Sequence, residues 1–96
     1  MEEETRVRLP KKGEILGKIV SMLGANRIQV DCEDGKERIC RIPGKMKKRV
    51  WTRVDDVVII KPWEYQPDER GELVWRYTAN QAAVLKKKGY LKNIDI

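Results

Sequence analysis

The sequence contains no histidine, no phenylalanine, a single serine and only two cysteines in 96 residues. Without histidine, it lacks the side chain that most often acts as a general base near neutral pH. Ser21 lies in a predicted strand with no recognisable base beside it, and Cys32 and Cys40 have neither a CxxC spacing nor a histidine to complete a metal site. We therefore expect no enzyme, no metal and no cofactor. The cysteines should be reduced core residues, with a disulfide or a metal ligand as the alternatives.

Long apolar runs are also missing. Met1 is followed by three glutamates, which is the wrong charge for a signal peptide. No segment approaches the roughly 20 apolar residues that cross a bilayer. There is no long Gly/Ser/Pro stretch to divide the chain, so one domain is expected. We predict a cytoplasmic protein that is not bound to a membrane, and nothing in the sequence demands more than a monomer.

Positive charge is plentiful and very unevenly distributed. The segment Lys36–Arg53, called the basic segment below, carries a net charge of +7, against +6 for the whole chain. Everything outside it therefore sums to −1. Its cations are Lys36, Arg38, Arg41, Lys45, Lys47, Lys48, Arg49 and Arg53, opposed only by Glu37. Such a concentration is typical of a surface that binds a polyanion, most often nucleic acid.

RNA is the polyanion that this composition favours. Lysine and arginine bind phosphates, and an aromatic side chain such as Trp51 offers a surface on which an unpaired base can stack. Recognition of RNA usually needs such unpaired bases, because the major groove of the A-form helix is too narrow to read. The alternative is a solvated charged loop with Trp51 packed into the core. Trp63 and Trp75 are expected to be structural.

Alternating apolar and polar residues predict five strands. The predicted strands are residues 15–23, 27–32, 37–42, 57–60 and 73–77. The first should place Ile15, Gly17, Ile19, Ser21 and Leu23 on one face, and the last Leu73, Trp75 and Tyr77. The unbroken apolar run at 57–60 indicates burial on both faces, and Asp55-Asp56 before it indicates a turn. Five short strands favour an all-β OB-fold barrel, with an SH3-like barrel as the main rival.

Asp34-Gly35 predicts a hairpin between the second and third strands. A two-residue loop would place an arginine opposite Ile28. A three-residue loop, Asp34–Lys36, would pair Ile28 with Ile42 and would place Cys40 opposite Val30. Burial favours this second register, because a slip of one residue inverts a whole strand.

A short C-terminal helix is also predicted. Thr78 and Gln81 have the spacing of a capping box, Ala82 and Leu85 share an apolar face, and Gly89 suits a left-handed cap. Lysines 86–88 suit the negative end of the helix dipole. We expect a mobile N-terminal arm over residues 1–13, the barrel over 14–78, and the helix with a short tail over 79–96.

The stretches Asp34–Arg38 and Arg41–Trp51 closely resemble the archaeal and eukaryotic translation initiation factor 1A family, which is related to bacterial initiation factor one. The likeness continues in Gly17–Gly24, Asp55–Ile60 and Trp75–Thr78, and spans roughly residues 14–92. It implies a non-enzymatic OB-fold factor that binds the small ribosomal subunit at its A site through ribosomal RNA of the decoding region. It also implies support for placing the initiator tRNA and for selecting the start site.

Carried over to this chain, the resemblance implies an RNA-binding loop with two extensions. Lys45, Lys47, Lys48 and Arg49 would enter the RNA groove, Arg38 and Arg41 would extend the surface along the barrel, and Trp51 would support its edge. With Arg53, these are the predicted RNA-binding residues. Short tails point to an archaeal member of the family.

The end of the chain, Ile94, Asp95 and Ile96, resembles the terminal motif through which eukaryotic members contact the initiation GTPase of the 5B family; a frayed tail is the alternative. Two other functions remain open. One is a general single-stranded RNA-binding protein or RNA chaperone of the cold-shock type. The other is a protein-interaction module on an SH3-like barrel.

Overall fold

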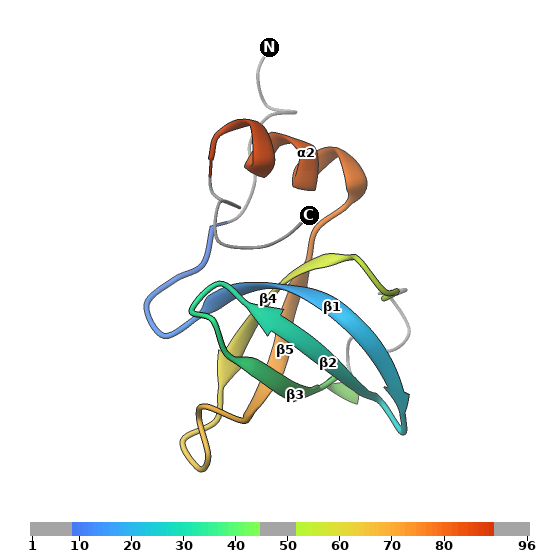
Figure 1. The fold of residues 1–96 in the computed structure, drawn as a ribbon, viewed down its shortest axis with the longest axis vertical. Helices are drawn as coiled ribbons and strands as arrows, with labels where there is room; N and C mark the ends of the chain where they lie inside the picture. Colours follow the sequence, from blue (N-terminus) through green and yellow to red (C-terminus); the bar gives the residue numbers. More distant parts are fainter. Residues whose placement is uncertain (1–8, 45–51, 90–96) are drawn as a thin grey trace.

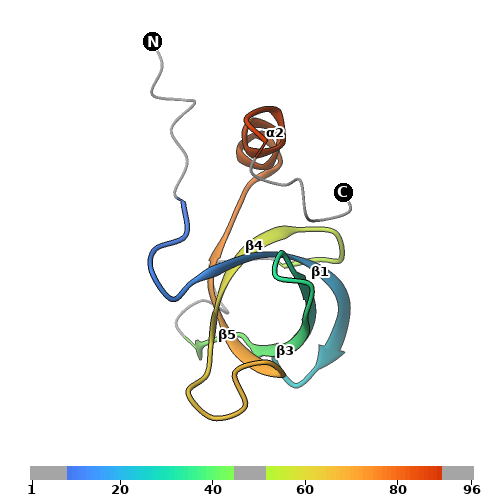
Figure 2. The same cartoon turned by 60° about the vertical axis from the view of Figure 1, so that its left-hand side comes forward.

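The chain folds into a closed five-stranded barrel with one helix beside it. The computed structural model describes residues 9–44 and 52–89. Its elements are β1 (Ile15–Gly24), β2 (Arg27–Cys32), β3 (Glu37–Arg41), β4 (Val57–Pro62), β5 (Arg70–Arg76) and helix α2 (Ala79–Lys87) (Figure 1). The strands close in the order β1-β2-β3-β5-β4, with β3 and β5 parallel and the other pairs antiparallel. Figure 2 shows the ring of strands with α2 beyond one side of it. This confirms the predicted OB-fold barrel with a short C-terminal helix.

Two apolar clusters hold the fold together. The barrel interior contains Ile19, Ile28, Val30, Cys32, Cys40, Val58, Ile60 and Leu73. A second cluster lies between the barrel wall and α2, and contains Leu16, Val57, Ile59, Tyr77 and Leu85. Alternate residues of β4 belong to different clusters because side chains along a strand point to opposite faces. The unbroken apolar run at 57–60 is therefore buried on both sides, as predicted.

The predicted face of β1 is correct only for its first half. Gly17 lies so close to β2 that an added Cβ would overlap the Val30 side chain, which is how the strand bends into a small barrel. Register shifts follow between Ile19 and Ser21 and again before Gly24. A bulge changes which side chains face inward, and Leu23, predicted to face inward, is 45% exposed.

The β2–β3 hairpin has a three-residue loop, but not the predicted one. The Cys32 amide donates to the Lys36 carbonyl (2.9 Å), so the loop is residues 33–35, with Gly35 at φ 86° in its last position. Glycine is favoured there because that position needs a positive φ. Ile28 therefore pairs with Cys40 and Val30 with Arg38. The predicted pairs were wrong by two residues, a shift that keeps the faces, so Arg38 shares the inward face of Cys40 in either register.

A second irregularity alters β5. Ile60 pairs with Leu73 but Ile59 pairs with Trp75, so one extra residue is inserted on β5. Leu73 therefore faces the barrel interior while Tyr77 joins the cluster under α2. Trp75, which we expected to be structural, is 38% exposed. The prediction that these three side chains share one face was wrong, because the bulge interrupts the alternation.

The helix begins and ends as predicted. The Gln81 amide donates to Thr78 Oγ1 (3.2 Å) and the Thr78 amide donates to Gln81 Oε1 (3.0 Å), which completes the capping box. Leu85 is buried and Gly89 has a φ of 85°. Over the described ranges no helix has the length and apolar character needed to cross a membrane. The predicted arm at 1–13 lies largely outside these ranges.

Both cysteines are free and buried, as predicted. Burial disfavours the thiolate, and it raises the pKa of the Cys40 thiol to about 12. Within residues 9–44 and 52–89, no group of histidine, cysteine or acidic side chains is arranged to hold a metal ion.

Candidate nucleic-acid interface

The basic segment includes β3. After that strand the segment leaves the barrel, and it rejoins the barrel before β4. Of its predicted RNA-binding residues, Arg38, Arg41 and Arg53 are described by the structure, whereas Lys45, Lys47, Lys48, Arg49 and Trp51 lie outside the described residues. The geometry therefore shows the two points on the barrel between which the segment is held.

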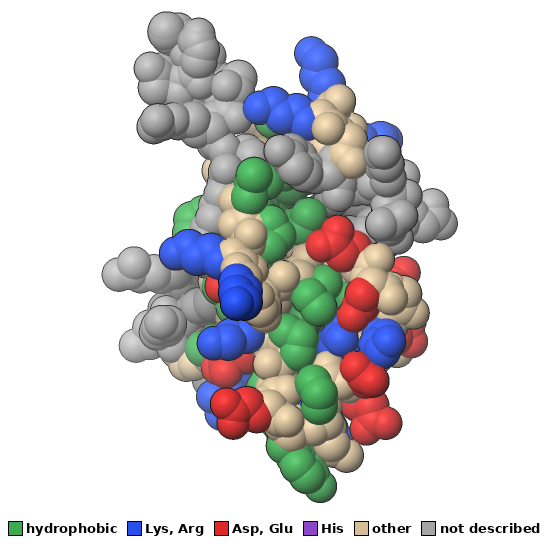
Figure 3. Space-filling model, turned by 90° about the vertical axis from the view of Figure 1, so that its left-hand side faces the viewer, with side chains coloured by type: hydrophobic (Ala, Val, Ile, Leu, Met, Phe, Trp, Pro, Cys, Tyr) green, Lys and Arg blue, Asp and Glu red, His purple; other side chains and the backbone are tan. Residues whose placement is uncertain are grey.

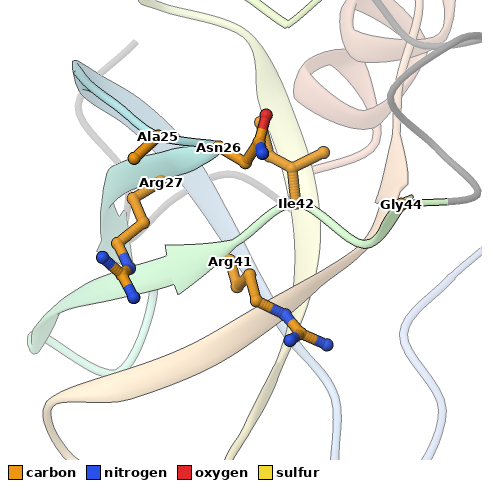
Figure 4. Close-up of a pocket in the computed structure, with 6 residues that line it drawn as sticks. All are labelled: Ala25, Asn26, Arg27, Arg41, Ile42 and Gly44. Atoms are coloured by element: carbon orange, nitrogen blue, oxygen red, sulfur yellow. The ribbon is translucent and has the colours of Figure 1, made fainter.

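A hollow of about 230 Å³ lies at the point where the segment leaves the barrel. It is lined by Ala25, Asn26, Arg27, Arg41, Ile42 and Gly44 (Figure 4). Arg27 and Arg41 are directly opposite each other on β2 and β3, so their side chains extend to the same side of the sheet. Both are exposed. Two guanidinium groups beside an open hollow can bind phosphate oxygens.

Arg27 is a candidate that the sequence analysis missed. It precedes the basic segment by several residues, so the count of local charge did not include it. Only the correct pairing of β2 with β3 places it opposite Arg41. A prediction that put Gly35 last in the hairpin loop would have found it.

The β1–β2 turn forms the other rim of the hollow. Ala25 and Asn26 both have positive φ (49° and 62°), the conformation of a two-residue hairpin turn. The Asn26 carbonyl accepts a hydrogen bond from the Ile42 amide (2.8 Å). The turn and the end of β3 are thus linked, and the start of the basic segment is held against the barrel.

The charge of Arg41 is partly neutralised by an ion pair with Glu72. Its Nη2 atom lies 3.2 Å from Glu72 Oε2 on β5, and both side chains are at least one-third exposed. An exposed pair of this kind is worth at most about 1 kcal/mol. A phosphate could therefore compete with Glu72 for Arg41.

Arg38 does not belong to the surface, which corrects the prediction. The side chain is 3% exposed. Its two Nη atoms donate to the Asp34 carboxylate (3.1 and 2.9 Å), and Nε donates to the Pro67 carbonyl. The physical reason is the alternation along β3, which places Arg38 on the same inward face as Cys40 and opposite the inward-facing Val30. Arg38 joins the hairpin to the β4–β5 loop.

This pairing predicts a pH dependence of stability. Hydrogen bonds from Arg38 hold the pKa of Asp34 below its usual value. A carboxyl group with a depressed pKa stabilises the fold above the unfolded-state pKa, and that contribution is lost as pH falls through the folded-state pKa. We expect the wild-type protein to lose this stability below about pH 4. Thermal unfolding of wild type and Asp34→Asn between pH 2 and 7 should show curves that converge at low pH. Parallel curves would contradict the prediction.

Arg53, the last cation of the segment, is exposed. Its backbone amide donates to Asp56 Oδ2 (2.8 Å) at the start of β4. Figure 3 shows the charge on another face of the molecule: a band of hydrophobic side chains separates mainly basic side chains on one side from mainly acidic ones on the other. This face is therefore polarised, and it is not uniformly basic.

Comparison with known proteins identifies the family. Residues 4–95 match the family described as Translation initiation factor 1A / IF-1. The chain belongs to this family. Factor 1A proteins are not enzymes, in agreement with the lack of catalytic side chains in the sequence.

The factor 1A relatives are archaeal. Translation initiation factor 1A of Methanopyrus kandleri is 57% identical over 93 residues, covering 95% of this chain and 83% of that protein. The protein of the same name from Archaeoglobus fulgidus is also 57% identical over 93 residues, covering 95% of both chains. The solution structure of translation initiation factor one from the Wolbachia endosymbiont of Brugia malayi has a TM-score of 0.53 at 20% identity, and covers 81% of this chain and 87% of that one. At that identity, the last comparison supports the fold alone.

Proposed function

We propose that this factor 1A protein binds the small ribosomal subunit at its A site, where the basic segment contacts ribosomal RNA of the decoding region. The observation that carries the proposal is the position of this segment. The segment comprises β3 and most of the connection from β3 to β4 of an OB-fold barrel, and residues 42–53 of that connection alone carry a net charge of +5. Exposed arginines, Arg41 and Arg53, flank the part in between.

The proposed contacts are electrostatic and do not require catalysis. Lys45, Lys47, Lys48 and Arg49 would enter the RNA groove, and Arg41 and Arg53 would bind phosphates at either end. Arg27 joins this surface because it shares the hollow with Arg41. Trp51 would stack on or support a base at the edge. Arg38 has no part in it.

The wider assignment follows from the same family. We propose that the protein acts in the cytoplasm as a monomer, and supports placement of the initiator tRNA and selection of the start site. The tail residues Ile94, Asp95 and Ile96 lie outside the described residues, and their contact with a 5B-type initiation GTPase stays a prediction.

Replacing Lys47, Lys48 and Arg49 with alanine tests the proposal. We expect affinity for purified small subunits to fall by about tenfold or more, because three phosphate contacts are lost. The matched control replaces Lys86, Lys87 and Lys88, which removes the same net charge from α2. Equilibrium binding by fluorescence anisotropy, at fixed salt, would measure both.

Two outcomes would contradict the proposal. Equal losses in the two triple variants would show that net charge, and not the segment, sets the affinity. If the wild-type protein bound an unstructured single-stranded RNA as tightly as the subunit, the general RNA-binding alternative would be favoured.

A further inference from the structure

A single carboxylate holds the point where the basic segment rejoins the barrel. Asp56 Oδ2 accepts one hydrogen bond from the Arg53 amide (2.8 Å) and another from Arg76 Nε on β5 (3.0 Å). The Asp56 amide in turn donates to the Arg53 carbonyl (3.1 Å). The Asp56 and Arg76 side chains are only 19% and 23% exposed. The ion pair is thus partly shielded from water, and it is stronger than a fully exposed one.

The backbone around Asp56 is joined to β1 as well. The Asp55 amide donates to the Ile19 carbonyl (2.7 Å), and the Ile19 amide donates to the Asp56 carbonyl (2.9 Å). Asp56 is therefore connected to β1 through its main chain and to β5 through its side chain. Arg53, by contrast, is connected to this framework through the Asp56 carboxylate and the short turn that the carboxylate closes.

We propose that Asp56 is a positioning residue for RNA binding: paired with Arg76, it fixes the direction in which Arg53 leaves the barrel. It does not touch RNA, since a carboxylate would repel phosphate. The proposal rests on the function proposed above, and it assigns a role to two residues, Asp56 and Arg76, that the charge pattern alone does not indicate.

The physical reason is preorganisation. A cation that is already held in its bound direction loses less conformational freedom on binding than one on a loosely held chain. The other end of the segment is held by a main-chain bond, Ile42 to Asn26, which no side-chain substitution removes. The end at Arg53 is held by the main-chain bond from the Asp56 amide and also by the Asp56 side chain, and the contribution of the side chain can be tested by substitution.

Asp56→Asn separates positioning from charge. Asparagine keeps an oxygen that can accept from the Arg53 amide but loses the ionic attraction to Arg76. Removing a negative charge near RNA should by itself strengthen binding. We expect the opposite, a loss of about fivefold in affinity for the small subunit. The slope of log K against log salt should stay unchanged, because the same phosphates are contacted.

The neighbouring carboxylate supplies the matched control. Asp55 is 79% exposed, and its φ of 78° is one that asparagine tolerates. Asp55→Asn removes the same charge at almost the same place, so its affinity should equal or slightly exceed that of wild type. Amide hydrogen exchange gives a second readout: exchange at Arg53 should accelerate in Asp56→Asn, relative to Ile19, and not in Asp55→Asn.

A third variant guards against a simple folding defect. Arg76→Gln removes the ion-pair partner of Asp56 and leaves Asp56 in place. The double variant, Arg76→Gln with Asp56→Asn, should lose little more affinity than Asp56→Asn alone, because the pair acts as a unit. All measurements are made where thermal unfolding shows each variant fully folded. Additive losses, or affinity in Asp56→Asn equal to or above wild type, would overturn the positioning role. Failure of the proposed function is distinguishable, since the Lys47/Lys48/Arg49 variant would then bind normally.

Discussion

Replacing Arg38 with methionine should destabilise the fold by about 3 kcal/mol, since it removes the guanidinium group that pairs with Asp34 and donates to the Pro67 carbonyl. Methionine resembles the aliphatic stem of arginine, so the main loss is that of the guanidinium group. The variant leaves the Pro67 carbonyl without its side-chain donor, and it leaves the Asp34 carboxylate with the Lys36 amide but without the two donors of Arg38. Denaturation in urea, followed by tryptophan fluorescence, would measure the change.

Arg41→Met is the matched control for Arg38→Met. It makes the same substitution on the same strand, at a residue whose ion pair with Glu72 is exposed. We expect it to cost less than about 1 kcal/mol of stability. If both variants lost the same stability, the buried pairing of Arg38 would not matter to the fold.

In affinity for the small subunit, the order of the two variants should be reversed: the variant that loses more stability should lose less affinity. Arg38→Met lies away from the proposed interface and should bind the small subunit almost as well as wild type, when measured where it is folded. Arg41→Met should weaken binding. If Arg38→Met weakened binding more than Arg41→Met, Arg38 would be a contact residue, and its assignment to the interior of the protein would be contradicted.

Affinity for the small subunit should fall by more than a hundredfold when monovalent salt rises fourfold at constant magnesium. Each contact with a phosphate of a single strand contributes about −0.7 to the slope of log K against log salt. About six contacts, well within the cations of the basic segment, give a slope near −4. Titration of labelled protein with subunits at several salt concentrations would measure this slope.

The variants that remove the segment's cations should change this slope in a defined way. Loss of three phosphate contacts in the Lys47/Lys48/Arg49 variant should make the slope shallower by about 2. The control at Lys86, Lys87 and Lys88 should leave it unchanged. An affinity insensitive to salt would contradict the electrostatic interpretation altogether.

Features that depend on neighbouring residues were read correctly from the sequence. The capping box between Thr78 and Gln81, the turn at Asp55-Asp56 and the buried run at 57–60 each follow from a local pattern of side chains. The concentration of charge in the basic segment is likewise a property of the chain itself. Together with the five alternating segments, the local patterns predicted the OB-fold barrel, which is confirmed. The nucleic-acid partner stays a prediction.

Features that depend on register were not read correctly. A shift of two residues between β2 and β3 preserves the alternation of faces, so burial could not distinguish the predicted register from the actual one. That shift set Arg38 opposite Val30 and Arg27 opposite Arg41. The bulge between β4 and β5 similarly brought Trp75 toward the surface.

The sequence alone thus determined where the charge is concentrated, where the chain turns and how many strands it forms. Each of these depends on side chains that are close together along the chain. The contact of Arg38 with the Pro67 carbonyl, 29 positions away, emerged only on folding. So did the contact of Asp56 with Arg76, which are 20 positions apart. Such pairings depend on how strands align across the barrel. Several alignments satisfy the same hydrophobic pattern, and one of them is selected by hydrogen bonding and close packing.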